Sequence, residues 1–247
     1  MSGQRKLLIY THAMAGGGAE RVCASLASGF VRRGDNVLLA VDYEARDNSA
    51  YVDTDVQHLA LGKGHFWNVI HLARALRREK PDVVMSALGI SNLKLTIAAL
   101  LSGYLSRSIL SYHGFASNEP QFLSRVAYWL TPLETRITAA TVCVSESLRN
   151  YIIATWWAST RRTVRIFNPV AIRLAEKIEV QNVPMVLAVG RLNRQKNFPG
   201  LVRAFGLIAH TDAKLVILGE GPERKLIETE IVRLGLSERV RLAGYVR

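Results

Sequence analysis

The segment 189–205, VGRLNRQKNFPGLVRAF, places two cations where an anionic group could be held. Arg191 and Lys196 stand five positions apart in a predicted loop that follows an apolar strand and precedes a helix with Pro199 in its first turn. The Arg guanidinium is planar and can donate two parallel hydrogen bonds, and the Lys ammonium acts as a point charge. A helix N-terminus adds backbone N–H groups that have no partner within the helix. Together they could hold a diphosphate as negative charge develops on it. A solvated basic loop is the alternative.

Two glycine-containing turns also follow predicted strands. Three glycines at 16–18 precede Glu20 at the start of a predicted helix, and they would let the backbone approach a phosphate closely. A flexible turn is the alternative, and the loop is not the GxGxxG dinucleotide fingerprint. The turn 219–221, Gly-Glu-Gly, leads into a helix that Pro222 begins and suits close approach of a nucleoside.

One histidine also falls at a strand end. His113 completes the predicted strand SILSYH and precedes Gly114. A lone histidine usually belongs to the core or the surface, but at the carboxyl end of a strand it could hydrogen-bond a substrate or transfer a proton. We therefore keep His113 as a candidate site residue.

The elements that must position these residues alternate between short apolar runs and helical patterns. Strands separated by helices of ten to fifteen residues indicate βαβ units and a parallel sheet covered on both faces. In such sheets ligands bind at the carboxyl ends of the strands, where each candidate falls. The predicted strands are 7–12, 36–42, 56–61, 82–88, 108–113, 141–145, 185–190, 214–219 and 239–244, and the predicted helices are 19–33, 69–78, 93–105, 121–139, 199–210 and 222–234.

The alternation is interrupted once, after Asn168 and Pro169. Residues 171–184 carry mixed charge and end in a proline, which predicts a linker. We expect an N-terminal Rossmann-like domain over 1–170, a linker over 171–184, and a partial C-terminal Rossmann-like domain over 185–247. The shorter domain should have an unpaired sheet edge and an uncovered apolar face.

Composition and net charge limit the partners and the cellular location that the protein can be expected to have. Of 247 residues, 49% are hydrophobic and 21% charged, which argues against disorder. The 32 basic and 20 acidic residues give a net charge of +12, which attracts polyanions or anionic lipid. No helix-turn-helix, RRM or zinc signature supports a nucleic-acid partner. No uncharged stretch is long enough to span a bilayer. We expect a cytoplasmic protein that can associate peripherally with the inner face of the membrane.

Aromatic and basic residues gather in two segments that could meet such a membrane. One is 122–129, and the other is 156–162, which begins with two tryptophans and ends with two arginines. Basic residues beside aromatic ones favour anionic headgroups. Packing of these aromatic residues in the core is the alternative.

Seven motifs carry a family resemblance. They are GGGAERV, SYHGF, VSES, FNPV, VGRLNRQKNF, LVILGEGPER and GYV, in this order along essentially all 247 residues. With them the chain resembles the retaining glycosyltransferases of family 4 (group 1, GT-B fold). The resemblance implies two Rossmann-like domains facing a cleft, the first holding a glycan or lipid-linked acceptor and the second a nucleotide-diphosphate sugar. It implies sugar transfer with retention of configuration, in cell-surface polysaccharide or glycolipid synthesis, without metal or other cofactor.

The resemblance also assigns roles to single residues on the donor side. It implies that Arg191 and Lys196 clamp the diphosphate and stabilise the departing nucleotide. The residues that would lie against the donor phosphates or near the nucleoside are Gly17, Gly18, Gly219 and Glu220.

On the acceptor side, Glu20 would face the acceptor, and Asn168 would mark the crossover between the domains and line the cleft. His113 would contact the transferred sugar or support the reaction. Family members continue past GYV with a Glu-x7-Glu motif, which this sequence does not reach. A truncated, catalytically inactive glycosyltransferase-like protein or subunit is therefore the alternative. The absent GxGxxG disfavours a third reading, an NAD(P)-dependent oxidoreductase.

Overall fold

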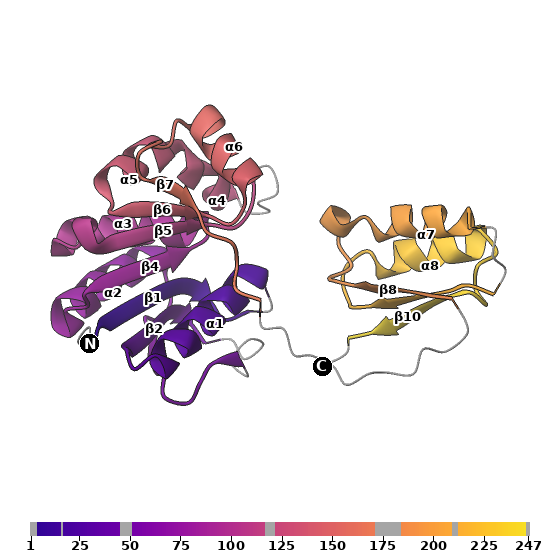
Figure 1. Ribbon diagram of the computed structural model, residues 1–247, viewed down its shortest axis with the longest axis horizontal. Helices are drawn as coiled ribbons and strands as arrows, with labels where there is room; N and C mark the ends of the chain where they lie inside the picture. The colour runs from indigo at the N-terminus through magenta and orange to yellow at the C-terminus, as the bar shows by residue number, and fades with distance from the viewer. Residues whose placement is uncertain are drawn as a thin grey trace. The chain divides into compact units, whose positions relative to one another are not determined.

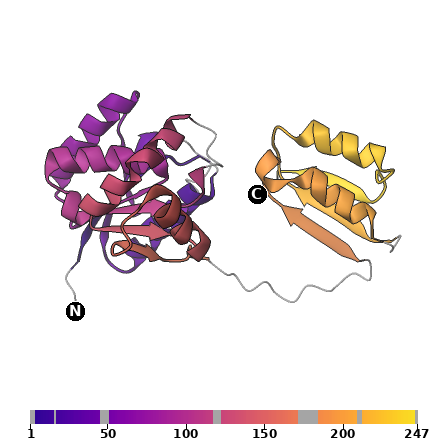
Figure 2. The ribbon, with the colours of Figure 1, turned by 90° about the horizontal axis from the view of Figure 1, so that it is seen from above.

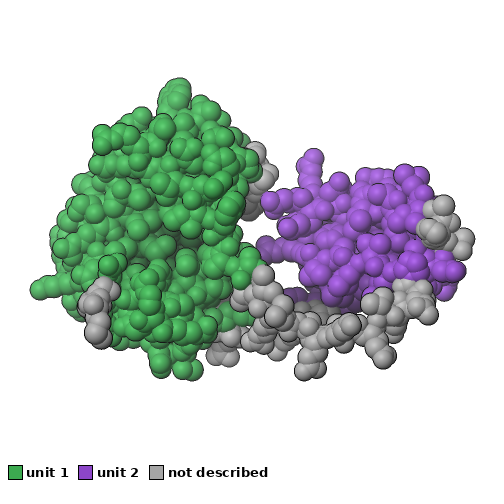
Figure 3. All heavy atoms as spheres, viewed as in Figure 1, with its two compact units in different colours: residues 1–171 green, residues 172–247 purple. Residues whose placement is uncertain are grey.

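A computed structural model describes residues 4–15, 17–44, 51–116, 122–170, 184–208 and 212–245 (Figure 1). The chain forms two compact units, residues 1–171 and 172–247, which Figure 3 shows in green and purple. Of the predicted linker 171–184, all but Pro184 lies outside the described residues. Both units are α/β with parallel sheets, as the alternating pattern predicts.

Unit 1 contains a seven-stranded parallel sheet in the order β3-β2-β1-β4-β5-β6-β7. The order reverses between β1 and β4, which is where open sheets of this kind bind ligands. The strands are β1 (Lys6–Ala13), β2 (Asn36–Tyr43), β3 (Gln57–Ala60), β4 (Val83–Ala87), β5 (Ser108–Tyr112), β6 (Ala140–Cys143) and β7 (Thr163–Arg165). The helices are α1 (Gly18–Arg32), α2 (His65–Glu79), α3 (Gly89–Ser102), α4 (Phe122–Ala127), α5 (Thr131–Ile137) and α6 (Glu146–Trp156).

Helices cover both faces of this sheet because alternate residues of its strands are apolar on each side. Small residues of α1, including Ala24 and Ala27, pack on Ile9 and the odd-numbered positions of β1 and β2. Helices α2, α3 and α6 pack on the opposite face, where Leu8 and Tyr10 are completely buried. Polar side chains, among them those of Asp42 and His113, lie at the carboxyl ends of the strands.

The predicted helix 121–139 is wrong as a single element. It is divided into α4, a 3₁₀ turn over Tyr128–Leu130, and α5. Pro132 lies in the first turn of α5, and a proline there cannot donate to the preceding turn and crowds the carbonyl four residues earlier. The sequence pattern also missed β7 and α6, the latter capped by the Ser145 hydroxyl, which accepts from the Leu148 N–H at 3.1 Å.

Unit 2 contains a three-stranded parallel sheet in the order β10-β9-β8, with β8 (Met185–Val189), β9 (Lys214–Leu218) and β10 (Val240–Gly244). Helices α7 (Phe198–Gly206) and α8 (Arg224–Arg233) lie on the same side of it (Figures 1 and 2). They enclose a core with Phe205, Leu215 and Ile217. Apolar side chains of β8, among them Leu187 and Val189, are exposed, in agreement with the predicted uncovered face.

Candidate functional site

The loop after β8 is shaped by two asparagines. The side chain of Asn193 accepts from the Lys196 N–H at 3.2 Å and begins a 3₁₀ turn over Arg194–Lys196. Asn197 adopts a left-handed conformation with φ of 50°, and its side chain caps α7 by accepting from the Gly200 N–H. These caps fix the loop while leaving the side chains of Arg191 and Lys196 exposed. The predicted cations are therefore presented to solvent at a strand end that leads into a helix N-terminus.

The turn at 219–221 packs against this loop through backbone. Leu218 O accepts from the Gly190 N–H and Glu220 O accepts from the Leu192 N–H, both at 2.9 Å. Gly219 has a φ of +144°, and a Cβ at this position would collide with the carbonyl oxygen of Gly190. A Cβ on Gly221 would likewise meet the Leu192 backbone. The glycines are thus required by the neighbouring loop, and their proposed contact with a nucleoside remains a prediction.

Glu220 is held by helix α8. Its Oε1 accepts from the Arg224 guanidinium at 2.6 Å, and Arg224 also donates to Glu228 at 2.9 Å. The pairs are i,i+4 contacts, and Glu220 and Glu228 are about half exposed. Such pairs contribute little to stability, but they direct the Glu220 carboxylate towards α8, beside the loop that carries Arg191.

In unit 1, Gly17 is the N-cap of α1 and lies directly against Glu20. A Cβ on Gly17 would overlap the Glu20 carboxylate, whereas a Cβ on Gly18 would meet no atom within 4 Å. The carboxylate therefore occupies the start of the helix, a position that favours negative charge. A phosphate could approach the side of Gly17 that a Cβ would occupy only if Glu20 moved aside. Gly16 lies outside the described residues.

His113 directly follows β5. Its Nε2 is 2.9 Å from the Ser111 hydroxyl, while its buried Nδ1 has no hydrogen-bond partner in the described part of the chain. Burial lowers the pKa of His113 to about 4. The ring is therefore neutral near pH 7 and can hydrogen-bond a substrate, but it cannot supply a proton as an imidazolium. Asn168 is exposed, in an irregular segment after β7.

Sequence reasoning missed a buried polar cluster at the carboxyl ends of β1 and β2. Oδ1 of Asp42 accepts from the Tyr10 hydroxyl at 2.7 Å. Oδ2 lies 2.5 Å from Nζ of Lys94 and 2.5 Å from Nδ1 of His12. The side chains of Asp42 and Lys94 are only 1% and 4% exposed, and that of His12 is 28% exposed. We name these four residues the Asp42 cluster.

The electrostatics of the Asp42 cluster favour a charged carboxylate. Burial works to raise the pKa of Asp42, but hydrogen bonds from His12, Lys94 and Tyr10 outweigh it and hold the pKa below its ordinary value. One sequence signal could have revealed the cluster. Lys94 is the first residue of the predicted helix 93–105 after Leu93, and the twelve residues that follow it are uncharged. A lysine on so apolar a helix is buried only with a partner.

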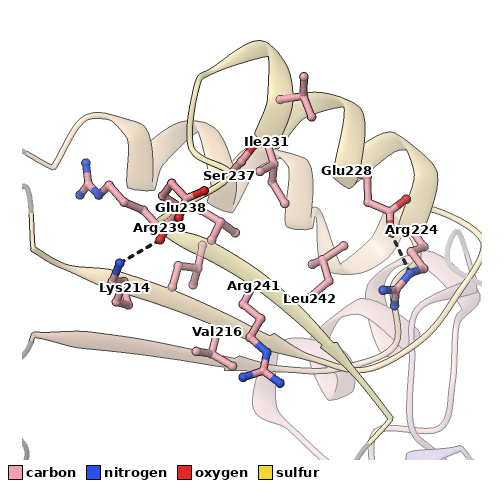
Figure 4. Close-up of a pocket in the computed structure, with 13 residues that line it drawn as sticks. Lys214, Val216, Arg224, Glu228, Ile231, Ser237, Glu238, Arg239, Arg241 and Leu242 are labelled. Atoms are coloured by element: carbon pink, nitrogen blue, oxygen red, sulfur yellow. Dashed lines mark hydrogen bonds and ion pairs between the residues drawn. The ribbon is translucent and has the colours of Figure 1, made fainter.

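A groove of about 600 Å³ runs along the edge strand β10 and beneath α8 (Figure 4). Arg241 and Val216 line one side of it, and Lys214 donates to the Glu238 carbonyl at 2.8 Å. None of the predicted site residues lines this groove. We therefore do not include it in the candidate site.

The two segments predicted to meet a membrane, 122–129 and 156–162, are partly at the surface. The side chains of Trp129 and Trp157 are among the most exposed of the described residues, at 73% and 71%. Trp156 instead packs between Tyr128 and Trp129, with ring centroids 5.6 and 5.7 Å apart. Core packing thus accounts for Trp156 but not for Trp129 and Trp157. None of the helices in the described part of the chain is long and apolar enough to cross a bilayer.

Among the described residues, no group of three or more His, Cys, Asp or Glu side chains is placed to hold a metal ion. The predicted independence from metal is not tested by this observation. It stays a prediction for an activity assay.

The seven-stranded parallel sheet of unit 1, with helices on both faces, is typical of doubly wound α/β domains, a class that binds ligands at the carboxyl ends of its strands. The chain belongs to Glycosyltransferase Family 4, whose family model matches residues 16–174. A second model, Glycosyl transferases group 1, matches residues 173–247. The family resemblance seen in the seven motifs is thereby confirmed.

Individual relatives and one solved structure are similar to the chain. The lipopolysaccharide core biosynthesis glycosyltransferase LpsE of Rhizobium meliloti is 25% identical over 93% of this chain, which covers 64% of the relative. A Campylobacter jejuni N-acetylgalactosaminyltransferase acting on a diphospho-undecaprenol glycan is 45% identical over 24% of this chain and 16% of its own. The crystal structure of Anabaena HepE with UDP and glucose matches 99% of this chain and 70% of its own, with a TM-score of 0.81 at 18% identity.

Proposed function

We propose that the protein transfers a sugar from a nucleotide-diphosphate sugar to a glycan or lipid-linked acceptor, with retention of configuration, in cell-surface polysaccharide or glycolipid synthesis. The observation that carries the proposal is the capped loop after β8, which presents Arg191 and Lys196 at a strand end. Family membership and the lipopolysaccharide enzymes among the relatives support it. The chain spans 64% of the length of LpsE. The activity, donor and acceptor of the whole protein are therefore part of the proposal.

The chemistry follows from the residues of this loop. Breaking the bond between the sugar and the diphosphate leaves negative charge on the leaving group. A guanidinium and an ammonium stabilise that charge most when it is fully developed, which lowers the barrier rather than merely tightening binding. His113, neutral near pH 7, would contact the transferred sugar through a hydrogen bond.

The loop offers a matched control for testing this role. Release of nucleotide from UDP- and GDP-sugars is measured for Arg191→Ala, Lys196→Ala and Arg194→Ala. The first two should lower kcat by at least about a hundredfold, a magnitude typical for the loss of a group that stabilises developing charge. Arg194→Ala removes the same charge from an exposed position of the same loop and should change kcat little. Equal effects of all three would refute the assigned roles.

The same assay separates the active enzyme from the alternative. A catalytically inactive glycosyltransferase-like subunit predicts no turnover with any donor. The proposal also includes independence from divalent metal, so an excess of EDTA should leave the rate unchanged. Loss of activity with EDTA, restored by Mg²⁺ or Mn²⁺, would contradict that part.

We also infer that the segment 125–136 meets an anionic membrane. Apolar residues with exposed side chains recur at helical spacing along its outer face, at Val126, Trp129, Leu130 and Leu133. A surface helix normally turns its apolar stripe inwards, and here a buried face already exists, with Tyr128, Thr131 and Glu134.

Basic residues border this outer stripe. Arg136 donates to the Trp157 carbonyl at 2.8 Å, which brings the end of α6 beside α5, and Arg162 donates to the Thr138 carbonyl. Arg125 is exposed at the other end of the stripe. Aromatic rings flanked by guanidinium groups suit the headgroup region of anionic lipid.

Sedimentation with vesicles tests this surface. The protein should bind phosphatidylglycerol vesicles and not pure phosphatidylcholine, and binding should weaken as salt rises. Trp129→Ser with Leu133→Ser should abolish most of the binding. The control Phe66→Ser alters an equally exposed aromatic residue of α2 and should have no effect. Unchanged binding in the double variant would refute the assignment.

A further inference from the structure

In the Asp42 cluster, His12 contacts Asp42 through Nδ1, and its second ring nitrogen, Nε2, takes no part in that contact. Strand pairing sets Thr11 opposite Val41 and Ala13 opposite Tyr43, so His12 and Asp42 are neighbours on the same side of the sheet. Because a carboxylate only accepts hydrogen bonds, Nδ1 donates to Asp42, and this contact fixes the orientation of the His12 ring. No hydrogen bond in the described part of the chain engages Nε2, and the His12 side chain is partly exposed. Nε2 is then a positioned polar atom at the carboxyl edge of the sheet, able to hydrogen-bond a hydroxyl group.

The charges beneath this ring cancel. Lys94 and Asp42 form a buried pair of opposite charges. The ring of His65 lies beside that of His12, with centroids 6.0 Å apart, and burial, with Lys94 and His12 nearby, lowers its pKa. His65 is therefore uncharged near pH 7. A site with a neutral floor suits an uncharged polar ligand better than an anion, because no net positive charge offsets the desolvation of a phosphate.

Two other rings, those of Tyr43 and His65, lie close to the ring of His12. Tyr43 meets the His12 ring edge-on, with centroids 5.2 Å apart and planes at 87°, and 45% of Tyr43 is exposed. The ring of His65 stacks on that of His12 with planes at 23°. Exposed aromatic surface beside a few positioned polar atoms is the composition of a small-ligand site. It fits a sugar ring, which has an apolar C–H face and a rim of hydroxyl donors.

We propose that His12, with Tyr43 and His65, binds a sugar ring of the acceptor, and that Nε2 of His12 makes a hydrogen bond with one of its hydroxyl groups. Asp42 and Lys94 are positioning residues that hold the His12 ring. The inference rests on the proposed function in naming the ligand as the acceptor. The sugar-binding site itself can be tested without any turnover.

The test is NMR of the full chain labelled with ¹³C and ¹⁵N in histidine. The His12 ring signals are those that disappear in His12→Gln. The protein is titrated with octyl glucoside, octyl galactoside and octyl N-acetylglucosaminide below their micelle concentrations, with octyl tetraethylene glycol ether as the sugar-free probe. At least one glycoside should shift the His12 signals saturably, and the ether should not. Tyr43→Ala should weaken that binding about three- to tenfold, which corresponds to ~0.7–1.4 kcal/mol.

His58→Gln is the matched control, because His58 is an exposed histidine on the neighbouring strand β3 and should leave binding intact. Three results would overturn the proposal: no shift with any glycoside, an equal shift with the ether, or a shift with inorganic phosphate alone. Tryptophan fluorescence of each variant checks that unit 1 remains folded.

Kinetics separates this inference from the proposed function. If transfer is observed, His12→Gln should raise the acceptor KM several-fold more than the donor KM. Transfer with an unchanged acceptor KM would refute the His12 site but not the proposed activity. Glycoside binding at His12 without any turnover would refute the proposed activity but not the site.

Discussion

Replacing Lys94 by methionine should strongly destabilise unit 1. The Lys94 side chain is 4% exposed and its Nζ lies 2.5 Å from an Asp42 carboxylate that is 1% exposed. Removing one partner leaves an uncompensated buried charge, which typically costs about 3–5 kcal/mol. Tyr10 and His12 still donate to Asp42 in this variant, so we expect the lower end, about 3 kcal/mol. Asp42→Asn should cost a similar amount because it leaves the Lys94 ammonium unpaired.

The double variant separates this pair from general damage to the core. With both charges removed, neither group is left unpaired, so the double variant should be at least ~2 kcal/mol more stable than additivity predicts. Lys6→Met is the control. Its pair with Glu79 has a similar distance, 2.8 Å, but the side chains are 32% and 21% exposed, and the expected cost is below about 1 kcal/mol.

Urea unfolding followed by tryptophan fluorescence measures these effects in unit 1 alone, because all four tryptophans of the chain lie there. Hydrogen bonds depress the pKa of Asp42 in the folded state, so its contribution is present above its ordinary pKa of 3.8 and is lost as pH falls through the folded value. The measurement therefore belongs at pH 7. Additive costs, or a loss below 1 kcal/mol in Lys94→Met, would refute the reasoning.

Burial raises the pKa of Glu134 from 4.5 to about 8, so stability present below pH 4.5 is lost as pH rises towards 8. Unit 1 should lose about 2.5 kcal/mol between pH 5 and 7 by urea unfolding, and Glu134→Gln should remove most of that slope. Gly219→Ala should destabilise unit 2 by roughly 3 kcal/mol, seen as faster amide exchange in β8, because a Cβ collides with a backbone carbonyl at positive φ. Gly17→Ala should change the acceptor KM by displacing Glu20, whereas Gly18→Ala, which meets no atom, should not; equal effects would contradict this.

The local pattern of the sequence was sufficient to predict most strands and helices. Apolar runs with period 2 and helices with period 3.6 are short-range features. Pro132 is a local signal too, but the helical pattern alone did not predict the division between α4 and α5. The glycine and cation motifs at the strand ends also lie within a few residues of each other. These local features carry the family resemblance and predict Arg191 and Lys196 as site residues.

The tertiary structure decided which of these residues meet and why. Lys94 lies 52 positions from Asp42, and only the pairing of β1 with β2 and the packing of α3 bring the two together. Gly219 is a glycine because another loop's backbone presses on it, a cause invisible in its own neighbourhood. Likewise, only the tertiary structure shows that Trp129 is exposed whereas Trp156 packs between two other rings. Periodicity reports the environment of a residue along its own element, whereas a buried ion pair or a close backbone contact depends on elements distant in sequence.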